Sequence, residues 1–437
     1  MSKILSFSDL VGKFHRVLDG LPDYRIGQNK SYSIKDAALG AFSVFFTQSP
    51  SFLAHQRTMK QNKGHSNAGS LFGIEQILCD NQIRNLLDPI EPHCLSPMFE
   101  QIFDDLEATG ELDSFRCFGG NLHVAFDGVH YFSSKNIHCS NCSHRTASNG
   151  VTTYFHSAIT PVIVASGNER VIALEPEFIV PQDGHDKQDC EQAAAKRWIN
   201  KHAEQYASKG VTISGDDLYC KQPFCELALD KDFNFLLVCK PESHKTLYEE
   251  IESLQASDSL SSLSIHCSTK KRLEVYTYRY ANKVPLRADE DALLVNWCEV
   301  TVTEGTDGKV LYYNTFATNH QITDQTVHPI VRDGRAHWKI ENENNNVLKN
   351  RGYHLEHNFG HGKKHLSSFL LTLNLLAFLF HVVLGLVDEK YLLLRKTLSA
   401  RQTFFNDIRA LLRYICFESW EHLLDFMITG LELTAPP

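Results

Sequence analysis

LHVAFDG at residues 122–128 is an apolar run that leads into Asp127, and VTISGDD at residues 211–217 is a second such run that ends in Asp216 and Asp217. Short apolar runs bounded by turn residues predict buried strands. Each aspartate comes at the end of its predicted strand, so the side chains can emerge together at one edge of a sheet. These two stretches predict the centre of the fold and of a candidate site.

The sequence around the two runs predicts an alternating arrangement of strands and helices. Two further strands are expected before the second run and one after it, and each gap between the later strands has a helical pattern. The expected elements are strands at Thr153–Ala165, Val171–Val180 and Phe233–Lys240, and helices at Asp186–Ser208 and Pro223–Leu229. The order β-β-β-α-β-α-β predicts a mixed sheet with flanking helices, in the α/β class.

The composition divides the chain into four regions. The 437 residues are 43% hydrophobic and 22% charged, as in a large globular protein. Residues 1–115 have helical patterning, with Ser33 as a candidate helix cap, and residues 116–240 hold the predicted strands. Residues 241–330 are rich in alternating runs and predict a β-rich insertion. Helical patterning returns over residues 331–437.

Three acidic residues form the candidate catalytic and metal-binding set: Asp127, Asp216 and Glu341. The two aspartates end strands, and Glu341 lies in WKIEN at residues 338–342, on a predicted helix that can pack against the same edge. Carboxylates are the oxygen ligands that Mg²⁺ prefers, and two such ions support in-line displacement at phosphorus. The alternative is that each strand-end aspartate is a turn former with no catalytic role.

Three blocks of sequence resemble those of insertion-sequence DDE transposases. They are VAFDGVHYF, ISGDDLYCKQPFCELALDKDFNFLLVCKPESH and HWKIENENNNVLKNRGYHLEHNFGHGKKH. The resemblance covers about residues 116 to 400 and implies a ribonuclease-H-like catalytic domain with a strand-rich insertion between the second aspartate and the glutamate. The acidic residues are 89 and 125 positions apart, and the longer gap accommodates the insertion expected from composition.

The resemblance implies that Asp127, Asp216 and Glu341 bind Mg²⁺ or Mn²⁺, as two ions. Asp217 is the rival of Asp216, and Asp-x-x-Tyr spacing to Tyr219 favours Asp216. Neighbouring residues of a strand point to opposite faces, so only one of the pair can face the site. Glu343 is the weaker rival of Glu341.

The chain departs from the family pattern near Glu341. Lys349 lies eight positions after the glutamate, where seven is usual, and His337 stands where an arginine is expected. Arg335 is a possible substitute for that arginine. These departures concern the contacts with a DNA end rather than the acidic triad.

The implied function is a DDE transposase that performs metal-dependent DNA cleavage and strand transfer at insertion-sequence ends. The expected partners are transposon ends and target DNA, with a homodimer holding paired ends. The alternatives are a ribonuclease-H-like nuclease without strand transfer and a non-catalytic DNA-binding protein. The expected location is the prokaryotic cytoplasm, in association with the nucleoid.

DNA contact is expected from a local basic segment, because the whole chain carries a net charge of −9. Residues 331–365 have a net charge of +3 and several histidines. Phosphate contacts from such residues position DNA without reading its sequence. The alternative is a solvated helix face. The candidate DNA-binding residues are Arg335, Lys339, Lys349, Arg351, Lys363 and Lys364.

The twelve cysteines are scattered, which favours a reducing cytoplasm over a disulfide framework. The segment HCSNCSH at residues 138–144 contains Cys139 and Cys142 in the spacing of a zinc ligand pair. The sequence offers no obvious second pair of ligands, so a structural zinc site, a redox pair and a plain hairpin with two thiols remain open. His357, His361 and His365 have the spacing of one helical face, which would suit a zinc site. Gly360 and Gly362 argue against a regular helix there.

Residues 366–387 form a stretch of 22 residues without Asp, Glu, Lys or Arg, which is long enough to cross a bilayer. Ser367, Asn374 and His381 recur every seven residues and form one polar stripe of a helix. Unpaired polar groups are costly in lipid. We therefore expect a buried helix in a soluble protein, with no membrane partner, and we expect Asn374 and His381 to find partners in the core.

Overall fold

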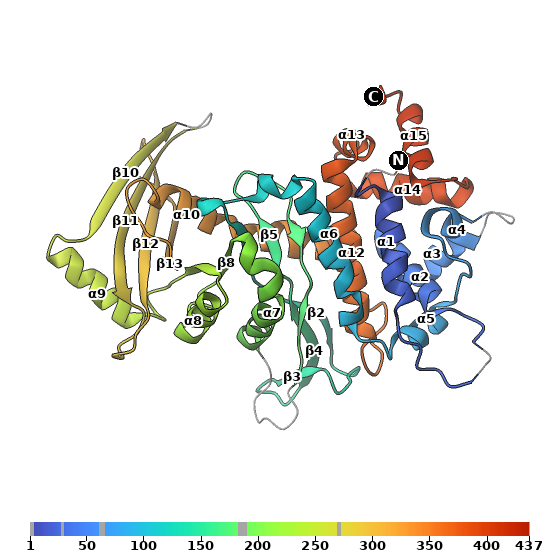
Figure 1. The fold of residues 1–437 in the computed structure, drawn as a ribbon, viewed down its shortest axis with the longest axis horizontal. Helices are drawn as coiled ribbons and strands as arrows, with labels where there is room; N and C mark the ends of the chain where they lie inside the picture. Colours follow the sequence, from blue (N-terminus) through green and yellow to red (C-terminus); the bar gives the residue numbers. More distant parts are fainter. Residues whose placement is uncertain (1–3, 28–29, 61–65, 182–189, 269–271, 437) are drawn as a thin grey trace.

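The computed structural model describes residues 4–27, 30–60, 66–181, 190–268 and 272–436, and Figure 1 shows their arrangement. The protein is a mixed α/β structure with 46% helix and 20% strand. A mixed sheet crosses the molecule, and a bundle of helices from both ends of the chain packs at one side. The α/β class expected from the sequence is therefore confirmed.

The described residues form a main sheet of nine strands, in the order β10-β11-β12-β13-β9-β8-β1-β5-β6. β1 pairs in parallel with β8, and β8 pairs in parallel with β9, while the other pairs are antiparallel. The strands are β1 (Leu122–Ala125), β5 (Val162–Val164), β6 (Ile172–Ala173), β8 (Val211–Gly215), β9 (Asn234–Val238), β10 (Ser261–Ser268), β11 (Leu273–Pro285), β12 (Leu294–Glu304) and β13 (Val310–Thr318).

A second sheet diverges from the main sheet at the end of β1. Its strands are β2 (Gly128–Ser134), β3 (Ser143–Thr146), β4 (Thr152–Ile159) and β7 (Glu177–Ile179). The backbone N–H of Thr160 donates to the carbonyl oxygen of Asp127 over 3.2 Å. Asp127 connects β1 to β2, and Thr160 connects β4 to β5, so both residues lie where the chain passes from one sheet to the other. Asp127 therefore lies at the fork between the two sheets.

The expected strands at Thr153–Ala165 and Val171–Val180 are each two strands, so the sequence-based boundaries were wrong. β4 and β7 belong to the second sheet, whereas β5 and β6 belong to the main sheet. Pro161 lacks an N–H group and cannot continue the strand ladder, which explains the break in the first run. The expected helix at Asp186–Ser208 is α7 (Glu191–Tyr206), and its first residues lie outside the described residues.

Residues 1–115 are helical in the described ranges, as expected. Ser33 caps α2 by accepting the backbone N–H of Asp36 over 2.8 Å. A serine side chain in this position satisfies an N–H group that has no partner inside the helix. The helices are α1 (Phe7–Asp19), α2 (Ile34–Phe46), α3 (Phe52–Lys60), α4 (Asn67–Phe72), α5 (Asp80–Leu87), η1 (Pro92–Leu95), α6 (Ser96–Ala108) and η2 (Glu111–Phe115), and the short η3 (Phe118–Gly120) follows just before β1.

The later helices cover the main sheet and complete the bundle. Along the chain, α7 (followed by η4, Ala207–Lys209) comes before β8, and α8 (Gln222–Asp230) comes between β8 and β9. The C-terminal helices pack with α1 and α2, so both ends of the chain share one hydrophobic core. The helices after β13 are α10 (Val327–Ala336), η5 (Ile340–Asn345), α11 (Asn346–Asn350), α12 (Leu366–Val387), α13 (Glu389–Thr397), α14 (Arg401–Tyr414) and α15 (Trp420–Gly430), of which α12 to α15 form this C-terminal part of the bundle.

The expected helix at residues 366–387 is α12, and it is the central helix of the bundle. Among the described residues, α12 is the one helix that is long and apolar enough to span a membrane. In its most apolar stretch of 18 residues, 83% of the residues are buried inside the protein. Asn374 donates to the carbonyl oxygen of Tyr353 over 2.9 Å, and His381 Nδ1 lies 2.6 Å from the Tyr353 hydroxyl. The expected core partners of Asn374 and His381 are confirmed, whereas solubility stays a prediction.

Residues 241–330 form α9 (Lys245–Ala256) and the hairpins β10 to β13 in their described part. The region is β-rich, as expected, but it extends the main sheet because β13 pairs with β9. A second hydrophobic core joins Tyr278 and Val300 of these hairpins to Val327 and Ile330 of α10. The insertion therefore leaves and re-enters the sheet at neighbouring strands and holds the start of the segment that carries Glu341.

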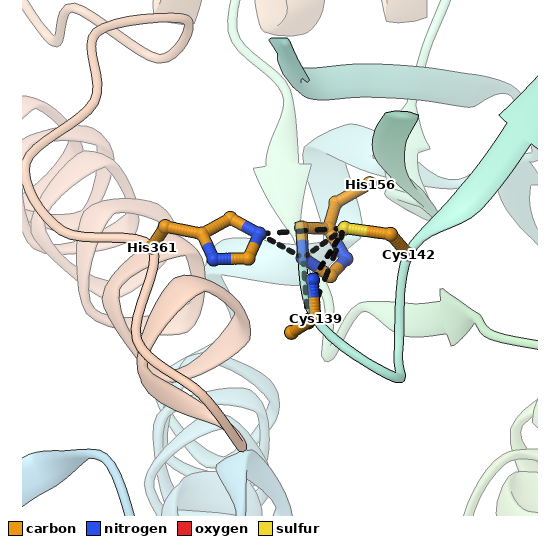
Figure 2. Close-up of side chains that lie close together, drawn as sticks. All are labelled: Cys139, Cys142, His156 and His361. Atoms are coloured by element: carbon orange, nitrogen blue, oxygen red, sulfur yellow. Dashed lines mark hydrogen bonds between the residues drawn. The ribbon is translucent and has the colours of Figure 1, made fainter. Parts of the chain in front are cut away.

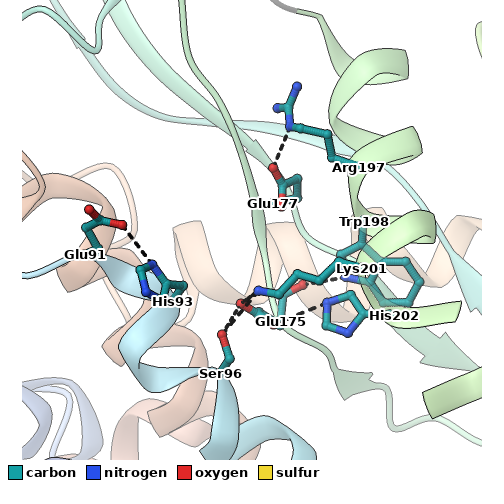
Figure 3. A network of polar contacts seen from close by, with 9 residues as sticks. All are labelled: Glu91, His93, Ser96, Glu175, Glu177, Arg197, Trp198, Lys201 and His202. Carbon is teal, nitrogen blue, oxygen red and sulfur yellow. Dashed lines mark hydrogen bonds and ion pairs between the residues drawn. The ribbon is translucent and has the colours of Figure 1, made fainter. Parts of the chain in front are cut away.

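A buried polar network ties the helical bundle to the main sheet (Figure 3). Glu175, which follows β6, accepts a hydrogen bond from Ser96 at the start of α6 and pairs with Lys201 of α7 over 2.5 Å. His202 Nε2 lies 3.2 Å from its other carboxylate oxygen, and Trp198 donates to its backbone carbonyl. Burial raises the pKa of Glu175, but these partners lower it by more, so the net shift is downward.

Replacing Glu175 by Gln should destabilise the protein by about 2 kcal/mol at neutral pH, because a buried charge pair loses one partner. Since the folded state lowers the pKa of Glu175, the stabilisation is present above its unfolded pKa and is lost as pH falls through the folded value. Urea unfolding from pH 7 down to pH 3 should show the difference between wild type and Glu175→Gln shrinking in acid. Glu177→Gln, which removes a more exposed pair with Arg197, is the control. An equal loss in both variants would contradict the prediction.

Candidate active site

Asp127 and Asp216 are brought together by the pairing of β1 with β8. The strands pair in parallel with Ala125 opposite Ser214, and each aspartate follows two residues later. Asp216 lies in the turn after β8, where its carboxylate accepts the backbone N–H of Leu218 over 2.8 Å. The two expected strand-end aspartates therefore occupy equivalent positions at one edge of the main sheet.

Glu341 reaches the same place from η5, a π-helical turn. The side-chain amide of Asn345 donates to Asp127 Oδ2 over 2.9 Å and to Glu341 Oε2 over 3.4 Å. Because one nitrogen contacts both carboxylates, these residues face a common point although 214 positions separate them. Residues 341 and 345 are about one turn apart and therefore point the same way, and π turns are frequent at functional sites.

Asn345 was not expected from the sequence, and its orientation is fixed by its neighbours. Its Oδ1 accepts from the Thr160 hydroxyl over 3.2 Å and from the Asn344 amide over 3.0 Å. With the oxygen occupied in this way, the nitrogen must point toward the carboxylates. The run of asparagines after Glu341 was the available signal, but sequence alone does not say which amide turns inward.

Glu191 is a fourth carboxylate at the site, and no sequence pattern points to it. It stands in the first turn of α7, where its side chain packs against Gly128; a Cβ atom at Gly128 would come within 2.3 Å of Glu191 Oε1. The hydroxyl of the buried Tyr219 donates to Glu191 Oε2 over 3.4 Å. Glycine at 128 therefore leaves the space that the fourth carboxylate occupies.

Burial and the neighbouring charges raise the pKa values of two of the carboxylates, Asp127 and Glu191. Burial, followed by the charges of Glu191 and Glu341, raises the pKa of Asp127 to about 7, and Asp216 adds a smaller contribution. Burial and the charge of Asp216 also raise the pKa of Glu191. A divalent cation among these oxygens would offset the repulsion, and the donor set fits Mg²⁺ or Mn²⁺. Two Cys/His groups among the described residues have donor atoms that all lie within 4.8 Å of one another. The carboxylates of this site are more widely spaced than that.

The rival acids point elsewhere. Asp217 accepts the backbone N–H of Lys240 over 2.7 Å and lies 3.3 Å from His244 Nε2, away from Asp127. His244 belongs to a buried group with Cys220 and Cys239. The charge of Glu343 acts on Lys339, whereas the charges that act on Asp127 are those of Glu191, Glu341 and Asp216. The geometry therefore favours Asp216 over Asp217 and Glu341 over Glu343.

The six candidate DNA-binding residues lie in different surroundings. Lys363 and Lys364 are exposed on the segment before α12, and Arg351 is exposed after α11. Lys349 pairs with Glu356 over 3.4 Å. Lys339 is buried, and its ammonium group donates to the carbonyl oxygens of the turn after β5, so it holds that turn and is not free for phosphate.

Arg335 lines an open pocket of about 380 Å³ beside the helix that leads to Glu341. Its guanidinium group lies 4.3 Å from the ring centre of Tyr312, and Tyr276 and Arg332 lie on the same pocket. Trp338, also on the pocket, is 52% exposed and precedes Glu341 by three residues. An exposed tryptophan beside arginines suits base stacking and phosphate contact.

His337 does not take the place of the arginine that the family pattern has. It is half-buried by surface area and enclosed by protein, with Nδ1 3.2 Å from the Ser214 hydroxyl of β8. Burial lowers its pKa to about 4, so it is neutral at physiological pH. It anchors the segment that carries Glu341 to the main sheet.

No protein-family model matches the chain, and no curated protein sequence matches it significantly.

Replacing Asp127 by Asn should stabilise the metal-free protein at pH 8 by on the order of 2 kcal/mol, because it removes a charge from a repulsive group. The pKa of Asp127 is about 7 in the folded protein, so the folded state keeps a proton that the unfolded state releases above about pH 4. Wild-type stability should therefore fall as pH rises from about 4 to 7, relative to the variant. Chemical unfolding in EDTA measures both; Asp217→Asn is the control, and parallel curves for Asp127→Asn and wild type would refute the explanation.

Proposed function

We propose that the protein is a metal-dependent DNA transposase of the DDE class with a ribonuclease-H-like catalytic domain. The observation that carries the proposal is the convergence of Asp127, Asp216 and Glu341 from two adjacent parallel strands and a distant helix. Three acids so far apart in sequence have no structural need to meet, and their repulsion has a cost. A catalytic metal site gives a reason for the arrangement.

The topology around the acids supports the fold assignment. The strands β6-β5-β1-β8-β9 have antiparallel pairing on one side of β1 and parallel pairing on the other, with α7 before β8 and α8 between β8 and β9. This resembles the ribonuclease-H-like order. The hairpins β10 to β13 stand where the family resemblance implies a strand-rich insertion.

The chemistry follows from the residues at the site. Asp127, Asp216 and Glu341 would hold Mg²⁺ or Mn²⁺, which would supply Lewis-acid activation of the nucleophile and stabilisation of charge at phosphorus. Asn345 holds Asp127 and Glu341 toward the same point, which lowers the reorganisation needed for metal binding. Trp338 and Arg335 lie on the pocket nearby and can hold the DNA end, by stacking and by phosphate contact.

A nuclease that cuts without joining uses the same acids, so it remains the second candidate. The DNA that flanks the gene on both sides supplies a concrete substrate, because inverted repeats there would mark the ends of the element. A transposase joins the cut ends to a second DNA molecule, whereas a nuclease releases them only. Two copies of the chain, one for each end, are the expected assembly.

The variants Asp127→Asn, Asp216→Asn and Glu341→Gln should each reduce cleavage by at least about a hundredfold, since each removes a metal ligand. Asp217→Asn and Glu343→Gln, the matched neighbours, should retain most of the activity. The assay is cleavage and joining of plasmids that carry both flanking sequences, in Mg²⁺ or Mn²⁺, with products resolved by sequencing. Joined products support the transposase, cleavage alone supports the nuclease, and no metal-dependent cutting by wild type would refute both.

DNA affinity should depend on Lys363 and Lys364 but not on Lys339. Replacing both exposed lysines by Ala should weaken binding at every sequence and reduce the slope of log affinity against log salt by about 2. Lys339→Ala should instead lower the melting temperature, because three carbonyl oxygens lose their donor. Fluorescence anisotropy across a salt series measures the first effect. A loss of affinity for folded Lys339→Ala equal to that of the double variant would contradict this division.

A further inference from the structure

Cys139, Cys142, His156 and His361 converge on one point outside the acidic site (Figure 2). The cysteines lie in the turn between β2 and β3, His156 is on β4, and His361 is in the segment before α12. Cys142, His156 and His361 are buried, and Cys139 is half-buried. The missing second pair of ligands for the CxxC motif is thus supplied by two histidines, one of them 219 positions away from Cys142.

We propose that these four residues bind a structural Zn²⁺ ion. Tetrahedral zinc with bonds of about 2.3 Å to sulfur and 2.0–2.1 Å to nitrogen requires separations of about 3.8 Å between sulfurs, 3.5 Å between sulfur and nitrogen and 3.3 Å between nitrogens. The Sγ atoms of Cys139 and Cys142 are 3.9 Å apart, and the Nε2 atoms of His156 and His361 are 3.2 Å apart. The sulfur–nitrogen distances are 3.6 Å from Cys139 to His156, 3.5 Å from Cys142 to His156 and 3.3 Å from Cys142 to His361.

The surroundings suit the ion as well as the distances do. His361 Nδ1 lies 2.9 Å from the carbonyl oxygen of Gly362, and donation there fixes the tautomer with Nε2 free to bind metal. The backbone N–H of Cys139 points to Cys142 Sγ over 3.5 Å, which stabilises a thiolate. Two thiolates balance the charge of Zn²⁺, so the buried centre is neutral. Thiolate and imidazole ligands select Zn²⁺ over Mg²⁺, which distinguishes this centre from the carboxylate site.

The proposed ion would cross-link the second sheet to the segment that precedes α12. The segment at residues 351–365 connects α11 with α12 and carries Lys363 and Lys364. The side chain of Asn141 donates to the carbonyl oxygen of Lys364 over 2.8 Å, which is a second link between the same two loops. The ion would thereby fix the basic segment against the second sheet. This role holds whether or not the protein is a transposase.

The test measures metal in the purified full-length protein by mass spectrometry, with Co²⁺ substitution as an optical probe. Wild type should contain zinc at the site, and Co²⁺ should give the intense visible bands and sulfur charge transfer of a tetrahedral site with two thiolates. Cys142→Ser and His361→Ala should each lose one equivalent. The adjacent His138→Ala is the matched control and should lose none, because His138 stacks on Tyr154 outside the cluster.

Two further variants separate a loss of zinc from a loss of folding. His361→Cys should retain one zinc and shift the Co²⁺ charge-transfer bands toward those of three thiolates. Cys239→Ser, in the separate group with Cys220 and His244, should leave the Co²⁺ spectrum of the first site unchanged. The proposal is overturned if wild type holds no zinc and binds none on titration, if iron or copper occupies the site in its place, or if Cys142→Ser retains all the zinc.

Discussion

The parallel pairing of β1 with β8 is the constraint on which the rest of the site depends. The two strands are buried, so a shift of register by one residue would turn every side chain to the opposite face. The register that buries Val124 and Ile213 is also the one that brings Asp127 and Asp216 to equivalent positions at the sheet edge. Hydrophobic burial therefore fixes the spacing of the two acids, and their repulsion is tolerated because the strands cannot move apart without exposing the core.

The sequence predicted the strand ends and the helix at residues 366–387 because those signals are local. An apolar run that stops at an aspartate, and a long apolar run with a polar stripe, can be recognised without knowing what packs against them. The second sheet was missed because β1 and β2 are separated only by Phe126 and Asp127, and the Asp-Gly pair there predicts the end of a strand without predicting a change of sheet. Glu191 was missed for the related reason that its role depends on the space above Gly128, which exists only in three dimensions.

The polar groups inside the core show where local reasoning ends. The stripe on α12 implied that Asn374 and His381 need partners, and unpaired buried polar groups are costly enough to make this a firm expectation. Their shared partner, Tyr353, also accepts a hydrogen bond from Arg401 of α14 over 3.1 Å. Nothing in the periodicity of α12 points to that tyrosine. Sequence predicts that such residues find partners in the core, and only the fold says which ones; Asn374 Oδ1 and His381 Nε2 still have none among the described residues.

Glu341 depends on anchors at both ends of its segment. On the near side, His337 contacts Ser214 of β8 and Lys339 donates to the carbonyl oxygens after β5, so η5 is tied to the main sheet just before the glutamate. On the far side, His361 reaches the cysteines of the second sheet. The two sheets diverge at Asp127, and the segment bridges them across that fork. The contacts of Lys339, together with the cross-link proposed at His361, would therefore constrain the position of Glu341 relative to Asp127 without touching either acid.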